Sequence, residues 1–95
     1  MYNTLHISGK KARKLVDNGA LLIDTRSPVQ FRDGTLTGAT NISARQVSTL
    51  MKHPRDTKIV FFGDNEVTTN VIINYAISMG FTNVYTFGTI DEWNS

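Results

Sequence analysis

The sequence predicts an α/β domain: a parallel sheet of about five strands covered by helices on both sides. Two observations carry this prediction. Short apolar runs alternate along the chain with segments whose apolar residues recur at helical spacing. The two clearest runs, 20–23 and 59–62, hold no polar residue, as is typical of strands buried on both faces of a parallel sheet. The length of 95 residues and the 40% hydrophobic content fit one domain over 1–95.

The first half of the chain predicts strand, helix, strand and loop in that order. A short alternating stretch at 5–7 is a weak strand signal. A helix follows, with Ser8 as its N-cap and Asn18-Gly19 at its end. The apolar run 20–23 then forms a strand. Residues 25–42 are expected to be loop, because proline and glycines interrupt them.

The second half predicts two more helices and two more strands. Apolar spacing indicates a helix over about 44–51, capped by Ser43 and stopped by Pro54. Strands are expected at 58–62 and 83–87, separated by a turn and by a helix over 67–79. A final helical turn is expected at 90–93.

The apolar pattern also predicts the core. The helix over 67–79 carries a wide apolar stripe at 67, 71, 72, 75, 76 and 79. From this stripe and the two clear strands, the residues expected in the core are Ile23, Val60, Phe61 and Val71.

Composition excludes several classes of function. The chain has no cysteine, which removes disulfides, thiolate catalysis, zinc-thiolate sites and iron–sulfur clusters together. Ten Lys and Arg against eight Asp and Glu give a net charge of +2, too small an excess to predict a nucleic-acid binder. No apolar run approaches the ~18 residues of a membrane span, and no signal-peptide pattern opens the chain. We therefore expect a cytoplasmic protein without cofactor, metal or membrane partner.

Ligands of open parallel sheets bind beyond the carboxyl ends of the strands, where two loops qualify, 24–38 and 63–66. The second loop leads into a helix N-terminus, which ordinarily attracts an anion. Here it carries Asp64 and Glu66, whose charges oppose an anion. We expect these carboxylates, or water, to occupy the free N–H groups of the helix.

Several segments together resemble the rhodanese-like domain family. Leu22-Ile23-Asp24-Thr25-Arg26 is similar to the family's D-x-R at the end of a central strand. The segment 30–42 is similar to its E-[FY]-x-x-G-H-I-x-G-A-x-N-I pattern, with Gln30 and Thr35 in place of Glu and His. The strand at 59–62, the Met79–Tyr85 segment and Trp93 also match. The resemblance covers nearly the whole chain and implies a three-layer α/β/α fold.

The departures from the family lie in the active-site loop. The resemblance implies a catalytic cysteine directly after the strand, which becomes a persulfide, and an arginine five residues later that holds the anionic sulfur donor. This chain has Gly63 and Thr68 at those two positions. Glycine has no nucleophilic atom, and threonine cannot form the bidentate contacts of a guanidinium group. The former active-site loop therefore consists of Gly63, Asp64, Asn65, Glu66, Val67 and Thr68.

The resulting hypothesis is a rhodanese-like domain without sulfurtransferase activity that binds neither persulfide nor thiosulfate. An interaction or regulatory role with a protein partner is what remains once the chemistry is removed. The resemblance makes Asp24 and Arg26 a structural pair, and with Gln30 in place of Glu, Arg26 needs Asp24 or a loop carbonyl as its acceptor.

Two alternatives stay open. Asp24, Asp64 and Glu66 could serve a repurposed enzyme or ligand site in the old pocket, including a site for a hard cation. The second is a basic interaction face on the first helix that binds an acidic protein or a phosphate backbone. That face consists of Lys10, Lys11, Arg13 and Lys14.

Overall fold

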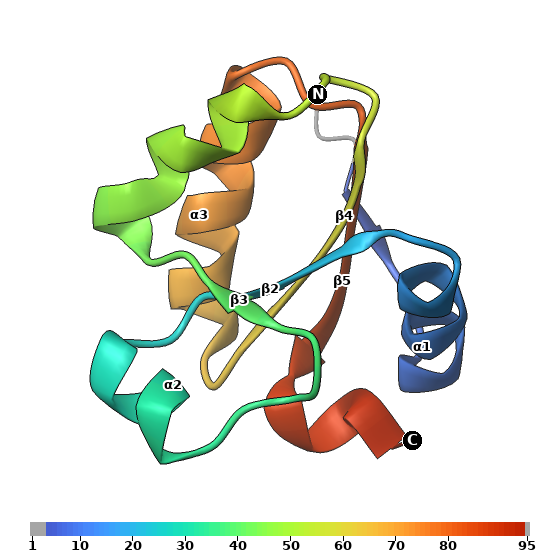
Figure 1. Cartoon of the computed structure of the whole chain (residues 1–95), viewed down its shortest axis with the longest axis vertical. Helices are drawn as coiled ribbons and strands as arrows, with labels where there is room; N and C mark the ends of the chain where they lie inside the picture. The colour runs from blue at the N-terminus through green and yellow to red at the C-terminus, as the bar shows by residue number, and fades with distance from the viewer. Residues whose placement is uncertain (1–3, 95) are drawn as a thin grey trace.

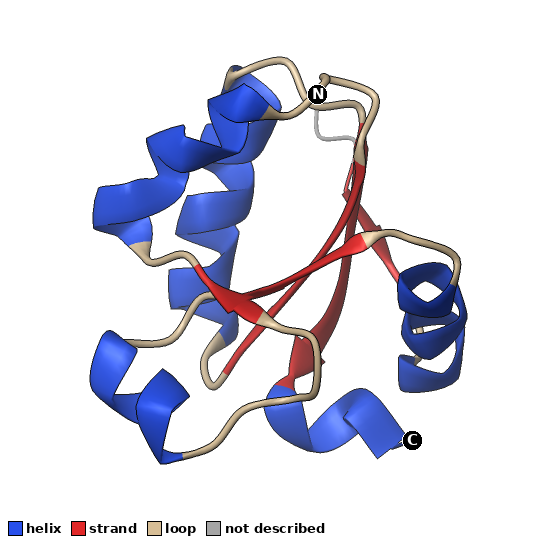
Figure 2. Cartoon of the chain, in the orientation of Figure 1, coloured by secondary structure: helices blue, strands red, loops and turns tan. Residues whose placement is uncertain are grey.

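The computed structural model describes residues 4–94 and shows five parallel strands in the order β1-β5-β4-β2-β3. This confirms the fold class predicted from the sequence (Figures 1 and 2). In chain order the elements are β1 (Thr4–His6), α1 (Gly9–Asp17), β2 (Leu21–Asp24), α2 (Pro28–Asp33), β3 (Thr40–Asn41), η1 (Ala44–Lys52), β4 (Lys58–Gly63), α3 (Glu66–Ser78), β5 (Asn83–Thr89) and η2 (Ile90–Asn94).

The sheet separates two hydrophobic cores. Helix α3 and the 3₁₀ helix η1 cover one face, while α1 and the 3₁₀ helix η2 cover the other (Figure 1). The central strand β4 serves both cores, because its side chains alternate between the faces. Ile59 and Phe61 belong to the α3 side, and Val60 and Phe62 to the α1 side. All four are completely buried, which explains why the strand shows no polar alternation in sequence.

Helix α1 begins and ends at the caps expected from the sequence, and a glycine also follows α3. The Ser8 hydroxyl accepts a hydrogen bond from the Lys11 N–H at 3.1 Å and begins α1. Gly19 and Gly80, with φ of 102° and 101°, follow the last turns of α1 and α3. None of the helices formed by residues 4–94 combines the length and apolarity that crossing a bilayer requires.

The expectation of an unbroken loop over 25–42 was wrong. Helix α2 forms there, and its start is a capping box in which Ser27 and Gln30 bind each other's backbone N–H groups. Pro28, which we interpreted as a loop signal, occupies the first helical turn, where its missing N–H costs nothing. The two residues of β3 are too few to produce a pattern in sequence.

The prediction that Val71 lies in the core was also wrong. Its side chain is 46% exposed, whereas Ile23, Val60 and Phe61 are buried as expected. The buried residues of α3 are Thr69, Ile72, Ile73 and Ala76. They follow the usual i, i+3, i+4, i+7 spacing of a buried helical face, but the polar Thr69 hid that spacing, and the apolar residues on the outer face indicated a different one.

Candidate functional site

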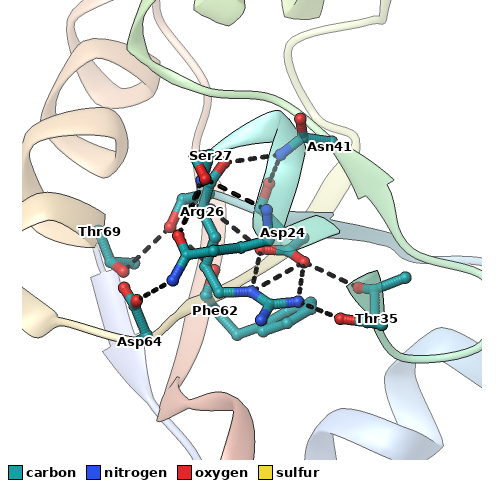
Figure 3. Close-up of polar contacts among 11 residues, drawn as sticks. Asp24, Arg26, Ser27, Thr35, Asn41, Phe62, Asp64 and Thr69 are labelled. Atoms are coloured by element: carbon teal, nitrogen blue, oxygen red, sulfur yellow. Dashed lines mark hydrogen bonds and ion pairs between the residues drawn. The ribbon is translucent and has the colours of Figure 1, made fainter. Parts of the chain in front are cut away.

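The candidate site lies at the carboxyl ends of β2 and β4, where the loops after the two strands meet (Figure 3). The strands run in register here, with Asp24 opposite Phe62. Asp24 therefore lies next to the strand residue that precedes Gly63. This register brings the Asp24–Arg26 segment against the former active-site loop.

Asp24 is the center of the polar network on the β2 side. Its carboxylate is completely buried and accepts hydrogen bonds from the Arg26 backbone N–H at 2.9 Å, from the guanidinium Nη2 at 2.8 Å and from the Thr35 hydroxyl at 2.8 Å. The hydrogen-bonded Asp24 carboxylate raises the pKa of Arg26 above its ordinary value, against the opposing effect of burial. The buried negative charge is thus fully compensated inside the fold.

Arg26 reaches both kinds of acceptor that the sequence leaves open for it. Besides Asp24, its Nη2 donates to the carbonyl of Gly34 at 2.6 Å (Figure 3). Asn41 completes this corner at the end of β2: its side-chain amide donates to the carbonyls of Asp24 and Arg26 at 3.0 and 2.8 Å. These contacts tie the end of β2 to the following loop and to β3, so the geometry gives Asp24 and Arg26 a structural role.

Gly63 lies at the end of β4 with no space for a side chain. A Cβ atom there would lie 2.6 Å from the Thr25 hydroxyl oxygen and closer still to that of Thr69. Real Cβ atoms essentially never approach other atoms so closely. The two threonine hydroxyls lie 3.1 Å apart, and each also contacts a backbone carbonyl, that of Phe62 at 2.9 Å or of Asn65 at 3.0 Å. They fill the volume that a side chain at position 63 would need.

The N-terminus of α3 is satisfied from within the loop, although not by the carboxylates that we expected. The Asn65 side-chain oxygen accepts hydrogen bonds from the N–H groups of Val67 at 2.8 Å and Thr68 at 3.3 Å. The carboxylate of Asp64 instead accepts a 2.6 Å hydrogen bond from the Gln30 side-chain amide. Asparagine is as effective an N-cap as aspartate, so the cap needs no charge.

Gln30 connects the two loops. Its amide oxygen takes part in the capping box of α2, and its amide NH₂ group binds Asp64 (Figure 3). A glutamate at this position, as in the family pattern, would place a second negative charge against Asp64. The glutamine at 30 and the aspartate at 64 therefore fit each other.

The three acidic residues of the alternative site do not converge. Asp24 binds Arg26, and Asp64 binds Gln30. Glu66 lines a separate cavity of about 90 Å³ together with His6, Thr69, Asn70, Thr86 and Gly88. Among residues 4–94, no group of three or more histidine or acidic side chains is arranged to hold a metal ion.

The basic face of α1 is smaller than its sequence suggests. The guanidinium Nη1 of Arg13 donates to the Trp93 carbonyl of η2, and this side chain is only partly exposed. Lys10, Lys11 and Lys14 remain exposed. Arg13 thus fastens the C-terminal segment to α1, and three lysines form the free face.

The capped loop leads to a prediction about anions. Adding sulfate or phosphate should leave the backbone amide chemical shifts of residues 64–68 unchanged, because the Asn65 oxygen occupies two donors and Asp64 and Glu66 are negative. A like charge at about 5 Å costs about 3 kcal/mol at an effective dielectric constant near 20, more than the ~0.3–1 kcal/mol that a helix N-terminus offers. Saturable millimolar binding centered on these amides would contradict this prediction.

The roles of three residues that shape the site were not predicted from the sequence. No sequence pattern marks Thr25 and Thr69. Their hydroxyls occupy the space beside Gly63 only because the fold brings both residues next to it. The capping role of Asn65 had a signal, because an asparagine directly before a helix is a preferred N-cap. Asp64 and Glu66 on either side of it can also cap a helix, so the sequence alone does not single out the asparagine.

Comparison with known proteins identifies the family. A family model described as "Rhodanese-like domain" matches residues 8–95. Thiosulfate sulfurtransferase GlpE of Pseudomonas entomophila is 29% identical over 93 residues, which are 94% of this chain and 84% of the relative.

Solved structures show the same fold. The single-domain sulfurtransferase RDL2 of Saccharomyces cerevisiae matches with a TM-score of 0.78 at 22% identity, over 95% of this chain and 88% of that one. The Alr3790 protein of Anabaena matches with a TM-score of 0.80 at 20% identity, over 90% and 81% of the two chains. With the family model covering residues 8–95, the chain belongs to the rhodanese-like domain family and is a member without any cysteine.

Proposed function

We propose that this rhodanese-like domain has no sulfurtransferase activity and acts as a protein-interaction or regulatory module. The observation that carries the proposal is Gly63 at the nucleophile position, with the adjoining volume filled by the hydroxyls of Thr25 and Thr69. Sulfur transfer through a persulfide needs a thiolate at that position. The chain has no cysteine at any other position to replace it.

The other parts of the expected sulfur-donor site are also changed. Thr68 stands where the family pattern has the arginine that binds the anionic donor, and a hydroxyl carries no positive charge. Two loop N–H groups that would face such an anion bind Asn65 instead. Asp64 and Glu66 add negative charge. Nucleophile, anion binding and electrostatics therefore all argue against the reaction.

The interaction part of the proposal rests on what the fold retains. The sheet, both cores and the Asp24–Arg26 corner are complete although the nucleophile is absent. Binding by a surface needs only this stable scaffold and no reactive group. We further propose a cytoplasmic location, to be checked by cell fractionation.

A sulfurtransferase assay tests the loss of activity. Purified protein mixed with thiosulfate and cyanide should form no thiocyanate above the rate without protein. GlpE of P. entomophila, named as a thiosulfate sulfurtransferase, is the positive control. Turnover that survives repurification and is proportional to protein concentration would refute the proposal.

The variant Gly63→Cys should also remain inactive in this assay. The new side chain would clash with the hydroxyls of Thr25 and Thr69, and position 68 still lacks an arginine. We expect the overpacked variant to lose about 1–3 kcal/mol of unfolding free energy. The double variant Gly63→Cys/Thr69→Ala should recover part of that loss, because it removes the hydroxyl nearest to the new Cβ, yet still form no thiocyanate. Full activity in the single variant would show that the space and charge arguments are wrong.

A further inference from the structure

Helix α3 presents an apolar ridge to solvent on the side facing away from the sheet. Val67, Val71 and Tyr75 lie at i, i+4 and i+8, and their exposed fractions are 74%, 46% and 51%. Residues at this spacing form one continuous row along a helix. The helix packs beside η1 on one side of the sheet (Figure 1). The ridge therefore has no cover from any element formed by residues 4–94.

Beyond Glu66 in its first turn, α3 carries no charge. The chain has 18 charged residues in 95, but none occurs from Val67 to Thr82. The exposed side chains around the ridge are polar but neutral: Thr68, Asn70, Asn74 and Ser78. A solvated helix face ordinarily carries charged residues, whereas the centers of protein interfaces are depleted in charge and enriched in tyrosine. This composition indicates a protein interface.

We propose that this α3 face, comprising Val67, Asn70, Val71, Asn74 and Tyr75, binds a second copy of the chain in a two-fold symmetric dimer. The occupant follows from charge. A charged partner surface would lose its hydration here without gaining any counter-charge. A second α3 face is neutral, so the two copies meet without repulsion and bury apolar surface on both sides. The inference adds a partner to the interaction role proposed above and rests on that role.

The geometry of the ridge suits an isologous contact. A row of residues at i, i+4 and i+8 fits into the equivalent groove of an identical helix, with an interaxial angle of about −50°. A two-fold axis near the middle of the helix places each ridge against the other and makes every contact occur twice.

Two asparagines beside the ridge match the same symmetry. The side chains of Asn70 and Asn74 make no hydrogen bond within residues 4–94, and both are exposed. A side-chain amide carries both donors and an acceptor, so it is complementary to the same group of a symmetry-related copy. In the dimer these amides border the apolar ridge and hydrogen-bond across the axis.

Sedimentation equilibrium of the whole chain tests the proposal. A contact limited to one helix face is at the small end of interface sizes, so we expect a dissociation constant on the order of 10–100 μM. The variant Val71→Arg should raise this constant at least about tenfold, equivalent to about 1.4 kcal/mol, because it brings like charges together at the axis. The matched control is Val29→Arg on α2, another valine exposed to a similar extent, 57%, which should dimerize like wild type.

The absence of cysteine permits a second, independent measurement. In Asn74→Cys the only thiol of the chain would lie on the proposed interface, and mild oxidation should produce a disulfide-linked dimer at protein concentrations where Val29→Cys stays reduced. A disulfide requires Cα atoms about 4.4–6.8 Å apart, so efficient linkage reports a close symmetric approach. Circular dichroism confirms that each variant is folded.

The outcomes separate this inference from the loss of activity. A wild type that stays monomeric at millimolar concentration, or equal behavior of the variants at 71 and 29, would overturn the dimer while leaving the thiocyanate assay unaffected. Monomeric wild type whose α3 amide signals shift only on adding a different protein would likewise overturn it and assign the face to that protein. Thiocyanate formation would refute the proposed inactivity without touching the dimer measurement.

Discussion

Replacing Phe61 with alanine is expected to lower the free energy of unfolding by about 3–5 kcal/mol. The side chain is completely buried in the core on the α3 side of the sheet. Truncation removes apolar contacts in the middle of the central strand and leaves a cavity that packed neighbors cannot fill. Since domains of this size are stable by about 5–15 kcal/mol, a large share of the total would be lost. Chemical denaturation followed by circular dichroism measures it.

The control for Phe61→Ala is Val71→Ala on the outer face of α3. This truncation should cost no more than about 0.5 kcal/mol, as is usual for exposed positions. Equal losses in the two variants would mean that the burial of α3 is assigned to the wrong face. The comparison should be made at low protein concentration, so that self-association through Val71 does not contribute.

Replacing Asp24 with alanine is the second change with a large expected effect. It removes the buried acceptor of Arg26 and Thr35 and leaves the Arg26 backbone N–H without its hydrogen bond. Breaking a buried ion pair from one side typically costs 3–5 kcal/mol. We expect a loss of about 3 kcal/mol in the free energy of unfolding, because the guanidinium group retains the Gly34 carbonyl and some contact with solvent.

The matched control for Asp24→Ala is Asp64→Ala. Asp64 is exposed and, among residues 4–94, accepts a single hydrogen bond, from Gln30, so its removal should cost less than about 1 kcal/mol. A loss below about 1 kcal/mol in Asp24→Ala would show that the network at the end of β2 contributes little to stability. The corner would then have to be held by Asn41 and the strand pairing alone.

The sheet could be predicted because its central strands carry strong local signals. The run from Ile59 to Phe62 is apolar because β4 has a core on each face, and the same holds for Leu22 and Ile23 in β2. The prediction was wrong in the parts of the fold where local sequence signals conflict. In α2, Pro28 marks both a turn and a first helical residue, and only tertiary contacts decide between them. On α3 the exposed face is also apolar, so the sequence does not show which face is buried.

The position of the loop between β4 and α3 could be predicted from the sequence, but the contacts around it could not. Gly63 and Thr68 can be recognized in the sequence because they follow the apolar strand at 59–62 by a fixed number of residues. The space beside Gly63 is filled by Thr25, which the register of β2 and β4 brings next to it, and by Thr69 near the start of α3. The Gln30–Asp64 hydrogen bond joins residues 34 positions apart for the same reason.

The hydroxyl pair of Thr25 and Thr69 has a consequence for evolutionary reversal. A single mutation that returned a cysteine to position 63 would first meet these two side chains, lowering stability before any chemistry was gained. An arginine at 68 would still be missing, and Asp64 and Glu66 would still oppose an anion. Under the proposed loss of activity, the path to a sulfur-transferring loop therefore takes several substitutions, and the first of them costs stability.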